Sequence, residues 1–134
     1  SPYDIIGHLI HGEKTDWILR AKIILSGQEN RTFVPFDRFA QLREDQNRKI
    51  SDMLQEFEDL RNRNLNFIKA LELTDEMLER TGNHPEFGTV NLRQLLSTWV
   101  VHDLNHIAQI CRVMSKQLPY EVGPWKNYLG ILNK

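Results

Sequence analysis

Two histidines spaced four residues apart are the clearest sign of chemistry in this sequence. His102 and His106 lie in a stretch whose apolar residues follow helical spacing. Positions i and i+4 of an α-helix share one face, with Cβ atoms about 6 Å apart. Two imidazoles placed in this way can bind one transition-metal ion. The alternative interpretation is a pair of core histidines, each bonded to the backbone or to a carboxylate such as that of Asp103.

A third ligand has to come from another part of the chain, and the N-terminal segment offers two histidines. His8 and His11 lie three residues apart, with Glu13 close by. His8 lies at the edge of the apolar face, where a side chain can face a cleft between helices, whereas His11 points further away. Imidazoles from His8, His102 and His106 would leave coordination positions open, which is typical of a catalytic metal. The alternative for His8 is an ordinary surface histidine.

An open three-histidine site suits Zn²⁺, and its nitrogen donors also accept Ni²⁺ or Fe²⁺. Such a metal lowers the pKa of a bound water or thiol toward 7. Asp103 and Glu13 are candidate acceptors for imidazole N–H groups, with ordinary charge on a helix surface as the alternative. The single cysteine, Cys111, has apolar neighbours in the sequence and is predicted to be a packed thiol and not a nucleophile.

The elements that would carry these residues are helices, because helical periodicity dominates and strand alternation is scarce. The segment Ser1-Pro2-Tyr3-Asp4 is typical of a helix start, with Ser as N-cap and Pro at the first helical position. Asn91 and Gln94 match the two partners of a capping box. The long helices are predicted over residues 1–27, from within 44–51 to about 71, and from 91 to before 119.

Short helices and ordered loops complete the predicted architecture. The short helices are expected from Thr74 to near Gly82 and from Pro124 to Leu132. The loops at 31–39 and 83–90 are expected to shape a substrate cleft. Their candidate contact residues are Phe36, Arg38, His84 and Glu86. The tryptophans Trp17, Trp99 and Trp125 are expected in the core. The sum is an all-α helical bundle in one domain over residues 1–134.

Composition limits the classes of function. The chain has 134 residues, 40% of them hydrophobic and 26% charged, as in one globular domain. With 17 basic and 18 acidic residues, the net charge of −1 gives no electrostatic basis for nucleic-acid binding. No apolar run approaches the roughly 20 residues of a membrane span, and no signal peptide is recognisable. One cysteine excludes an internal disulfide and favours a cytoplasmic location.

Two segments together resemble the metal-ligand helices of the DinB-like (DinB/YfiT-like) superfamily. They are Gly7–Trp17, which contains His8, and Trp99–Ile110, which contains His102 and His106 followed by an Ile-x-Gln-Ile segment. The resemblance covers nearly the whole chain. It implies a four-helix bundle with a divalent metal on three histidines, which match His8, His102 and His106. The family also has a helix before the Ser-Pro segment, which is missing from this sequence, so we expect exposed apolar surface and a homodimer.

The resemblance also implies a class of activity. The superfamily is bacterial and includes S-transferases that use low-molecular-weight thiols such as bacillithiol or mycothiol, besides proteins labelled metal-dependent hydrolases. We therefore expect a metal-dependent thiol S-transferase that acts on a small-molecule substrate. A metal-dependent hydrolase is one alternative, and a non-catalytic, stress-related bundle with a structural metal is the other. No nucleic-acid or membrane partner is expected.

Overall fold

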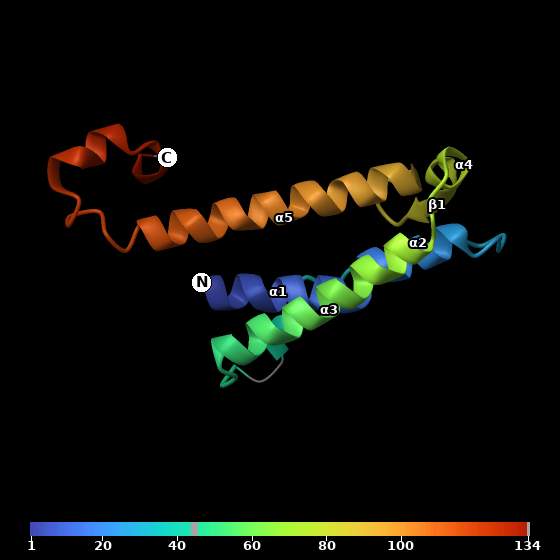
Figure 1. Cartoon of the computed structure of the whole chain (residues 1–134), viewed down its shortest axis with the longest axis horizontal. Helices are drawn as coiled ribbons and strands as arrows, with labels where there is room; N and C mark the ends of the chain where they lie inside the picture. The colour runs from blue at the N-terminus through green and yellow to red at the C-terminus, as the bar shows by residue number, and fades with distance from the viewer. Residues whose placement is uncertain (44–45, 134) are drawn as a thin grey trace.

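The computed structural model describes residues 1–43 and 46–133, and these residues are mostly helical (Figure 1). Three long helices, α1, α3 and α5, dominate the molecule, and α2 continues the chain from α1. A small two-stranded sheet and short 3₁₀ helices complete it. The elements are α1 (Pro2–Thr15), α2 (Trp17–Leu25), η1 (Ala40–Arg43), α3 (Ile50–Ala70), α4 (Asp75–Glu79), β1 (Thr81–His84), β2 (Gly88–Asn91), α5 (Leu92–Ser115), η2 (Gly123–Tyr128) and η3 (Gly130–Leu132).

The N-terminal segment forms two helices and not the single predicted one. The chain bends at Asp16, whose φ and ψ of −113° and −85° are not helical. The Asp16 side chain pairs with Arg20 one turn further on, at 3.0 Å, and makes no capping bond to the start of α2. The bend brings Trp17 into a stacked contact with Trp99 of α5, with ring centroids 6.0 Å apart. This tertiary contact has no counterpart in the local sequence pattern.

The predicted starts of the first and third long helices are confirmed. Ser1 and Asp4 form a capping box at α1, and Asn91 and Gln94 form one at α5. In the second, the Gln94 N–H donates to Asn91 Oδ1 at 2.8 Å and the Asn91 N–H donates to Gln94 Oε1 at 2.9 Å. These caps satisfy N–H groups that a helix N-terminus leaves free. The start of α5, which carries two of the candidate ligands, therefore follows from local chemistry.

The segment expected as a second loop is a β-hairpin, so the all-α prediction is wrong in this detail. Strands β1 and β2 pair antiparallel, from Thr81 opposite Asn91 to His84 opposite Gly88. Thr32 adds a parallel bridge to Asn83, which ties the first loop to the hairpin. The helix expected to reach Gly82 ends at Glu79. Each strand has only four residues, too few for an alternating pattern to stand out in the sequence.

Two hydrophobic clusters hold the helices together. The smaller joins α1 to α3 through Ile6, Ile10 and Met53. The larger joins α2, the loop after it and α5. Its buried members are Trp17, Ile18, Ala21, Ile24, Phe33, Leu92, Leu95 and Trp99. At about 25 cal/mol per Å² of buried apolar surface, such clusters dominate the stability of a small domain.

Two residues expected inside the molecule lie on its surface. Trp125, in η2, is 70% exposed, and Cys111 is an exposed free thiol on α5. Figure 1 shows that η2 and η3 lie beyond the C-terminal end of α5. Several apolar residues of α5 are also exposed, among them Val100, Leu104, Ile107 and Met114. Among the described residues, no helix combines the length and the apolar character that crossing a membrane requires.

Candidate metal centre

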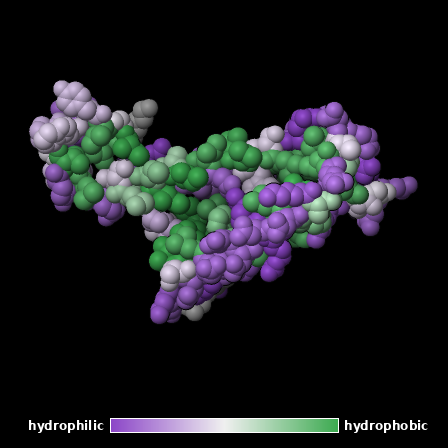
Figure 2. All heavy atoms as spheres, viewed as in Figure 1, coloured by the Kyte–Doolittle hydropathy of each residue, from purple (hydrophilic) through white to green (hydrophobic). Residues whose placement is uncertain are grey.

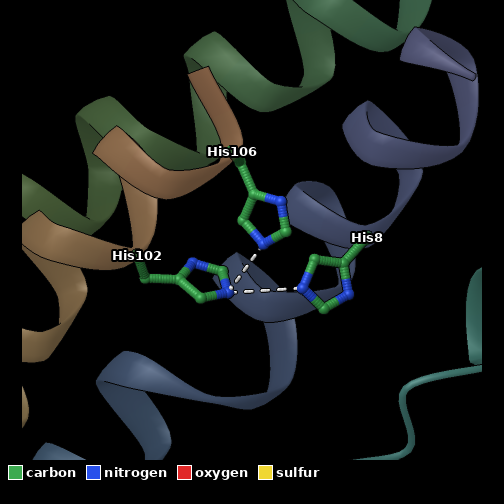
Figure 3. A group of neighbouring side chains, drawn as sticks. All are labelled: His8, His102 and His106. Atoms are coloured by element: carbon green, nitrogen blue, oxygen red, sulfur yellow. Dashed lines mark hydrogen bonds between the residues drawn. The ribbon is translucent and has the colours of Figure 1, made fainter. Parts of the chain in front are cut away.

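The structure brings His8, His102 and His106 together, although 94 residues separate the first two. His8 comes from the middle of α1, and the other two come from consecutive turns of α5. Figure 3 shows the three Nε2 atoms pointing toward one another. The Nε2 of His102 lies 3.3 Å from that of His8 and 3.1 Å from that of His106. Helix packing has therefore placed three nitrogen donors around one point.

These separations fit a metal ion. A zinc–nitrogen bond of 2.0–2.1 Å in tetrahedral geometry puts neighbouring ligand atoms about 3.3 Å apart. One ligand atom from each of the three histidines lies within 4.8 Å of the others. Three neutral imidazoles form a nitrogen donor set that suits Zn²⁺, Ni²⁺ and Fe²⁺. The residues present thus fit a divalent cation with at least one coordination position left open.

The hydrogen bond behind His106 favours the ligand form of its ring. His106 Nδ1 lies 2.7 Å from Gln109 Oε1, and an amide oxygen can only accept. Nδ1 therefore carries the proton in the neutral ring, and the lone pair lies on Nε2, which faces the other histidines. By contrast, the buried Nδ1 of His102 has no hydrogen-bond partner among the described residues. Gln109 is a functional candidate that sequence reasoning missed, since its only signal was a position three residues after His106.

The environment disfavours the charged forms of His8 and His102. Burial, followed by the neighbouring His106 and His102 rings, lowers the pKa of His8 from 6.5 to about 4. Burial, followed by His106, also lowers the pKa of His102. The Phe36 ring packs edge-on against the His8 ring, with ring centroids 5.4 Å apart. The Trp17 ring packs edge-on against the His102 ring, with ring centroids 5.1 Å apart. Neutral imidazoles are the form that binds a metal.

The two carboxylates expected behind the imidazoles have a different partner. Arg61 of α3 donates from Nε to Glu13 Oε1 at 2.6 Å. It also donates from Nη1 and Nη2 to the two oxygens of Asp103, at 2.8 and 2.9 Å. Both carboxylates therefore accept hydrogen bonds from a guanidinium and not from a histidine. Arg61 has no sequence signal beyond its place on a charged helix face.

A cavity of about 690 Å³ adjoins the three histidines. Both predicted cleft segments line it, the first with Phe36 and Arg38 and the second with His84 and Glu86. His84 Nδ1 accepts from the Glu86 N–H at 3.0 Å and the Phe87 N–H at 3.2 Å, which fixes the ring at the end of the hairpin. Burial, then the charge of Arg20, lowers the pKa of His84. His11 lies outside the group of His8, His102 and His106. Its ring packs against Phe36, with ring centroids 5.1 Å apart.

Comparison with known proteins gives consistent results. A family model described as the DinB superfamily matches residues 1–110. A Bacillus cereus (strain 03BB102) protein named "Putative metal-dependent hydrolase" is 31% identical over 108 residues, covering 79% of this chain and 60% of the relative. A Bacillus thuringiensis subsp. konkukian (strain 97-27) protein with a name of the same kind has the same identity and coverage. The chain therefore spans about 60% of the length of the curated relatives it matches.

Proposed function

We propose, from the premise that this chain belongs to the DinB superfamily, that it is the metal-binding part of an enzyme acting on small molecules. The ligands are the Nε2 atoms of His8, His102 and His106. The observation that carries the proposal is their convergence, with separations of 3.1 and 3.3 Å, beside an open cavity. Buried core histidines that merely bond to the backbone would not need to turn three ring nitrogens toward one point.

The protein side chains prepare this site in two ways. Gln109 holds the proton of His106 on Nδ1, so that Nε2 offers its lone pair. Phe36 and Trp17 pack against His8 and His102 and limit the rings to one orientation.

When bound, a divalent cation would act as a Lewis acid that lowers the pKa of a coordinated nucleophile. The cavity volume of about 690 Å³ lies in the usual range for small-molecule sites, about 300–1,000 Å³.

The reaction we propose is transfer of a low-molecular-weight thiol to an electrophile. A carbon–sulfur bond forms, the leaving group departs with its electron pair, and the thiol proton passes to solvent. Arg38, His84 and Glu86 line the cavity and are the proposed substrate contacts. Hydrolysis, with water as the nucleophile, is the second candidate, and the names of the Bacillus relatives favour it. Both reactions use the same open site.

Elemental analysis tests the metal site. The purified protein should contain about one equivalent of Zn, Ni or Fe, and the variants His102→Ala and His102→Ala/His106→Ala should lose it. His11→Ala is a matched control, because His11 is also a histidine of α1 but lies outside the group. Full metal occupancy in the His102→Ala/His106→Ala protein would refute the assignment. The folded state of each variant is checked by circular dichroism.

A second assay separates the two reactions. The metal-loaded protein is incubated with bacillithiol, mycothiol or cysteine and monobromobimane, and the loss of free thiol is followed. A parallel series contains p-nitrophenyl esters and no thiol. Conversion that requires both thiol and metal supports the transferase, whereas ester cleavage without thiol supports the hydrolase. A loaded protein that is inactive in both series would favour a structural role for the metal.

We also propose that a second copy of the chain covers the outer face of α5. This face consists of the exposed residues Val100, Leu104, Ile107, Cys111 and Met114. Their spacing of four, three, four and three residues is the seven-residue pattern typical of a helix–helix seam. The histidines of α5 lie on the opposite side of the helix, so dimer formation would leave the cavity accessible.

A further inference from the structure

We infer that Arg61 is a positioning residue for the proposed metal site, on which this inference rests. Its guanidinium joins the two helices that carry the ligands. Glu13 belongs to α1, as does His8, and Asp103 directly follows His102 on α5. Arg61 itself comes from α3, so one side chain connects three helices at the level of the site. We expect it to set the separation between the imidazole of His8 and those of α5.

The geometry of these contacts leaves the guanidinium little freedom. One edge of the fork holds both oxygens of Asp103, at 2.8 and 2.9 Å, and Nε holds Glu13 Oε1 at 2.6 Å. Such paired N–H···O bonds fix direction as well as distance. The Glu13 side chain is only 1% exposed, and that of Arg61 is 20% exposed. Water therefore has little access to the bond between Arg61 and Glu13, whereas the Asp103 side chain is 26% exposed.

Aromatic and amide groups hold the guanidinium from other directions. Its central carbon lies 5.1 Å from the centroid of a Trp99 ring and 4.9 Å from that of Phe57. Asn64, one turn further along α3, donates from Nδ2 to the carbonyl oxygen of Glu13 at 3.0 Å. Two residues of α3 therefore bind Glu13 of α1, Arg61 at its side chain and Asn64 at its backbone carbonyl. These contacts make the bridge a stiff link and not a loose surface ion pair.

The metal site needs such a link because it tolerates little displacement. Metal–ligand distances have to stay within about 0.2 Å of their usual values. Two ligands share α5, and their spacing follows from the helix itself. The third depends on how α1 lies against α5, and only packing can determine that. The ion pairs of Arg61 end at Asp103, one residue from His102, and at Glu13, five residues from His8. They therefore act on the separation between His8 and the histidines of α5.

If Arg61 acted only through its charge, removing it would change the metal affinity in the opposite direction from a loss of positioning. This difference makes the inference testable. Glu13, Arg61 and Asp103 together carry one negative charge. Removing the guanidinium leaves two negative charges near the cation, so Coulomb attraction alone would make the metal bind more tightly. Loss of positioning would make it bind more weakly. Groups that orient ligands from behind typically contribute about 10- to 100-fold in metal affinity.

The experiment compares Co²⁺ and Zn²⁺ affinities of the parent, Arg61→Met, Arg61→Lys and Lys14→Met, at temperatures where all are folded. Lys14→Met is the matched control, because it breaks another ion pair between α1 and α3, the 2.7 Å contact to Glu56. We expect affinity to fall by about 10-fold or more in Arg61→Met. The metal affinity of Arg61→Lys should fall by a similar factor, because an ammonium group lacks the planar arrangement of donors that a guanidinium has. Lys14→Met should stay within about twofold of the parent.

The ligand-field absorption of bound Co²⁺ supplies a second readout. A displaced His8 should change the shape of the Co²⁺ spectrum in both Arg61 variants, whereas a loss of global stability alone would leave it unchanged. Unchanged or tighter binding in folded Arg61→Met would overturn the inference while leaving the metal site intact. Should Arg61→Met not fold, Arg61→Lys decides in the same way. A parent that binds neither ion would refute the site itself, and the inference with it.

Discussion

Each of the three imidazoles at the centre of the molecule meets a different environment. His106 has an amide acceptor in Gln109, His8 packs edge-on against Phe36, and His102 packs edge-on against Trp17. Burial, and then repulsion from the neighbouring His106 and His102 rings, lowers the pKa of His8. The arrangement therefore favours neutral rings at His8 and His102 before any ion binds.

The stability of the metal-free protein should depend on the protonation of His8. Its pKa is about 4 in the folded chain, against 6.5 for an unperturbed histidine. Between these values the unfolded chain binds more protons, so stability is complete above about pH 6.5 and falls as the pH drops toward 4. Thermal unfolding of protein freed of metal by prior chelation, measured from pH 7 to pH 4, should show a falling midpoint. His8→Gln should show a shallower dependence, and identical curves would contradict this prediction.

Gln109 should contribute to metal affinity without touching the ion. In Gln109→Leu, Nδ1 of His106 loses its acceptor, so the ring is free to place its proton on Nε2. We expect metal affinity to fall by about 10-fold. Gln109→Glu keeps an acceptor oxygen and should retain affinity at or above that of the parent. Competition with a coloured chelator measures both, and equal affinity of Gln109→Leu and the parent would show that the hydrogen bond has no such role.

At the scale of elements, the β-hairpin and the bend at Asp16 build the side of the site that helices alone do not supply. The hairpin carries His84 to the cavity, and its bridge to Thr32 holds the loop that contains Phe36. The Phe33 N–H donates to the carbonyl of Asn83 at 2.9 Å, and Phe33 itself is buried in the larger cluster. The cavity wall thus depends on a close fit between the loop and the hairpin.

Gly82 should be essential to this fit. A Cβ at position 82 would lie 2.6 Å from Phe33 Cε1 and 3.0 Å from Ile24 Cγ1, so Gly82→Ala forces the hairpin away from the core. Overpacking of this kind costs about 1–3 kcal/mol. Gly130→Ala is the control, because a Cβ there meets no atom within 4 Å. Urea unfolding measures both, and a Gly82→Ala protein as stable as the Gly130→Ala protein would contradict the packing argument.

For the molecule as a whole, the distribution of apolar surface matters most. Figure 2 shows hydrophobic residues along α5 and polar residues over the visible side of α3. On the outer face of α5, Val100 is 61% exposed, Leu104 59% and Ile107 53%. A contiguous exposed apolar patch on a globular protein commonly marks an interaction site. The exposed apolar residues of α5 motivate the proposed dimer.

Charges on this face should dissociate the dimer. The double variant Leu104→Lys/Ile107→Lys places two positive charges in the seam, where an unpaired buried charge is costly. Light scattering after size-exclusion chromatography should give a dimer mass for the parent and a monomer mass for the variant. Val34→Lys is the control, because Val34 is 77% exposed but lies on a loop outside the seam. A monomeric parent at every concentration would refute the second copy as the partner.

The sequence by itself was sufficient to predict what depends on local chemistry. Caps at Ser1 and Asn91 set the starts of α1 and α5, because the bonds that stabilise them join residues three positions apart. The spacing of His102 and His106 on one helical face is equally local. The place of His8 at the edge of an apolar face, together with the resemblance to a known family, pointed to His8 as their partner, and the structure brings all three rings together.

Only the tertiary structure decided which distant groups meet. The pairing of Arg61 with Glu13 and Asp103, 48 and 42 residues away, leaves no periodic trace in the sequence. The same holds for the hairpin, the bend at Asp16 and the exposure of Cys111. Helix formation is governed by neighbours a few residues apart, whereas the approach of α1 to α5 depends on the packing of every side chain between them. For this reason the sequence could nominate the ligands but not the separation of their nitrogen atoms.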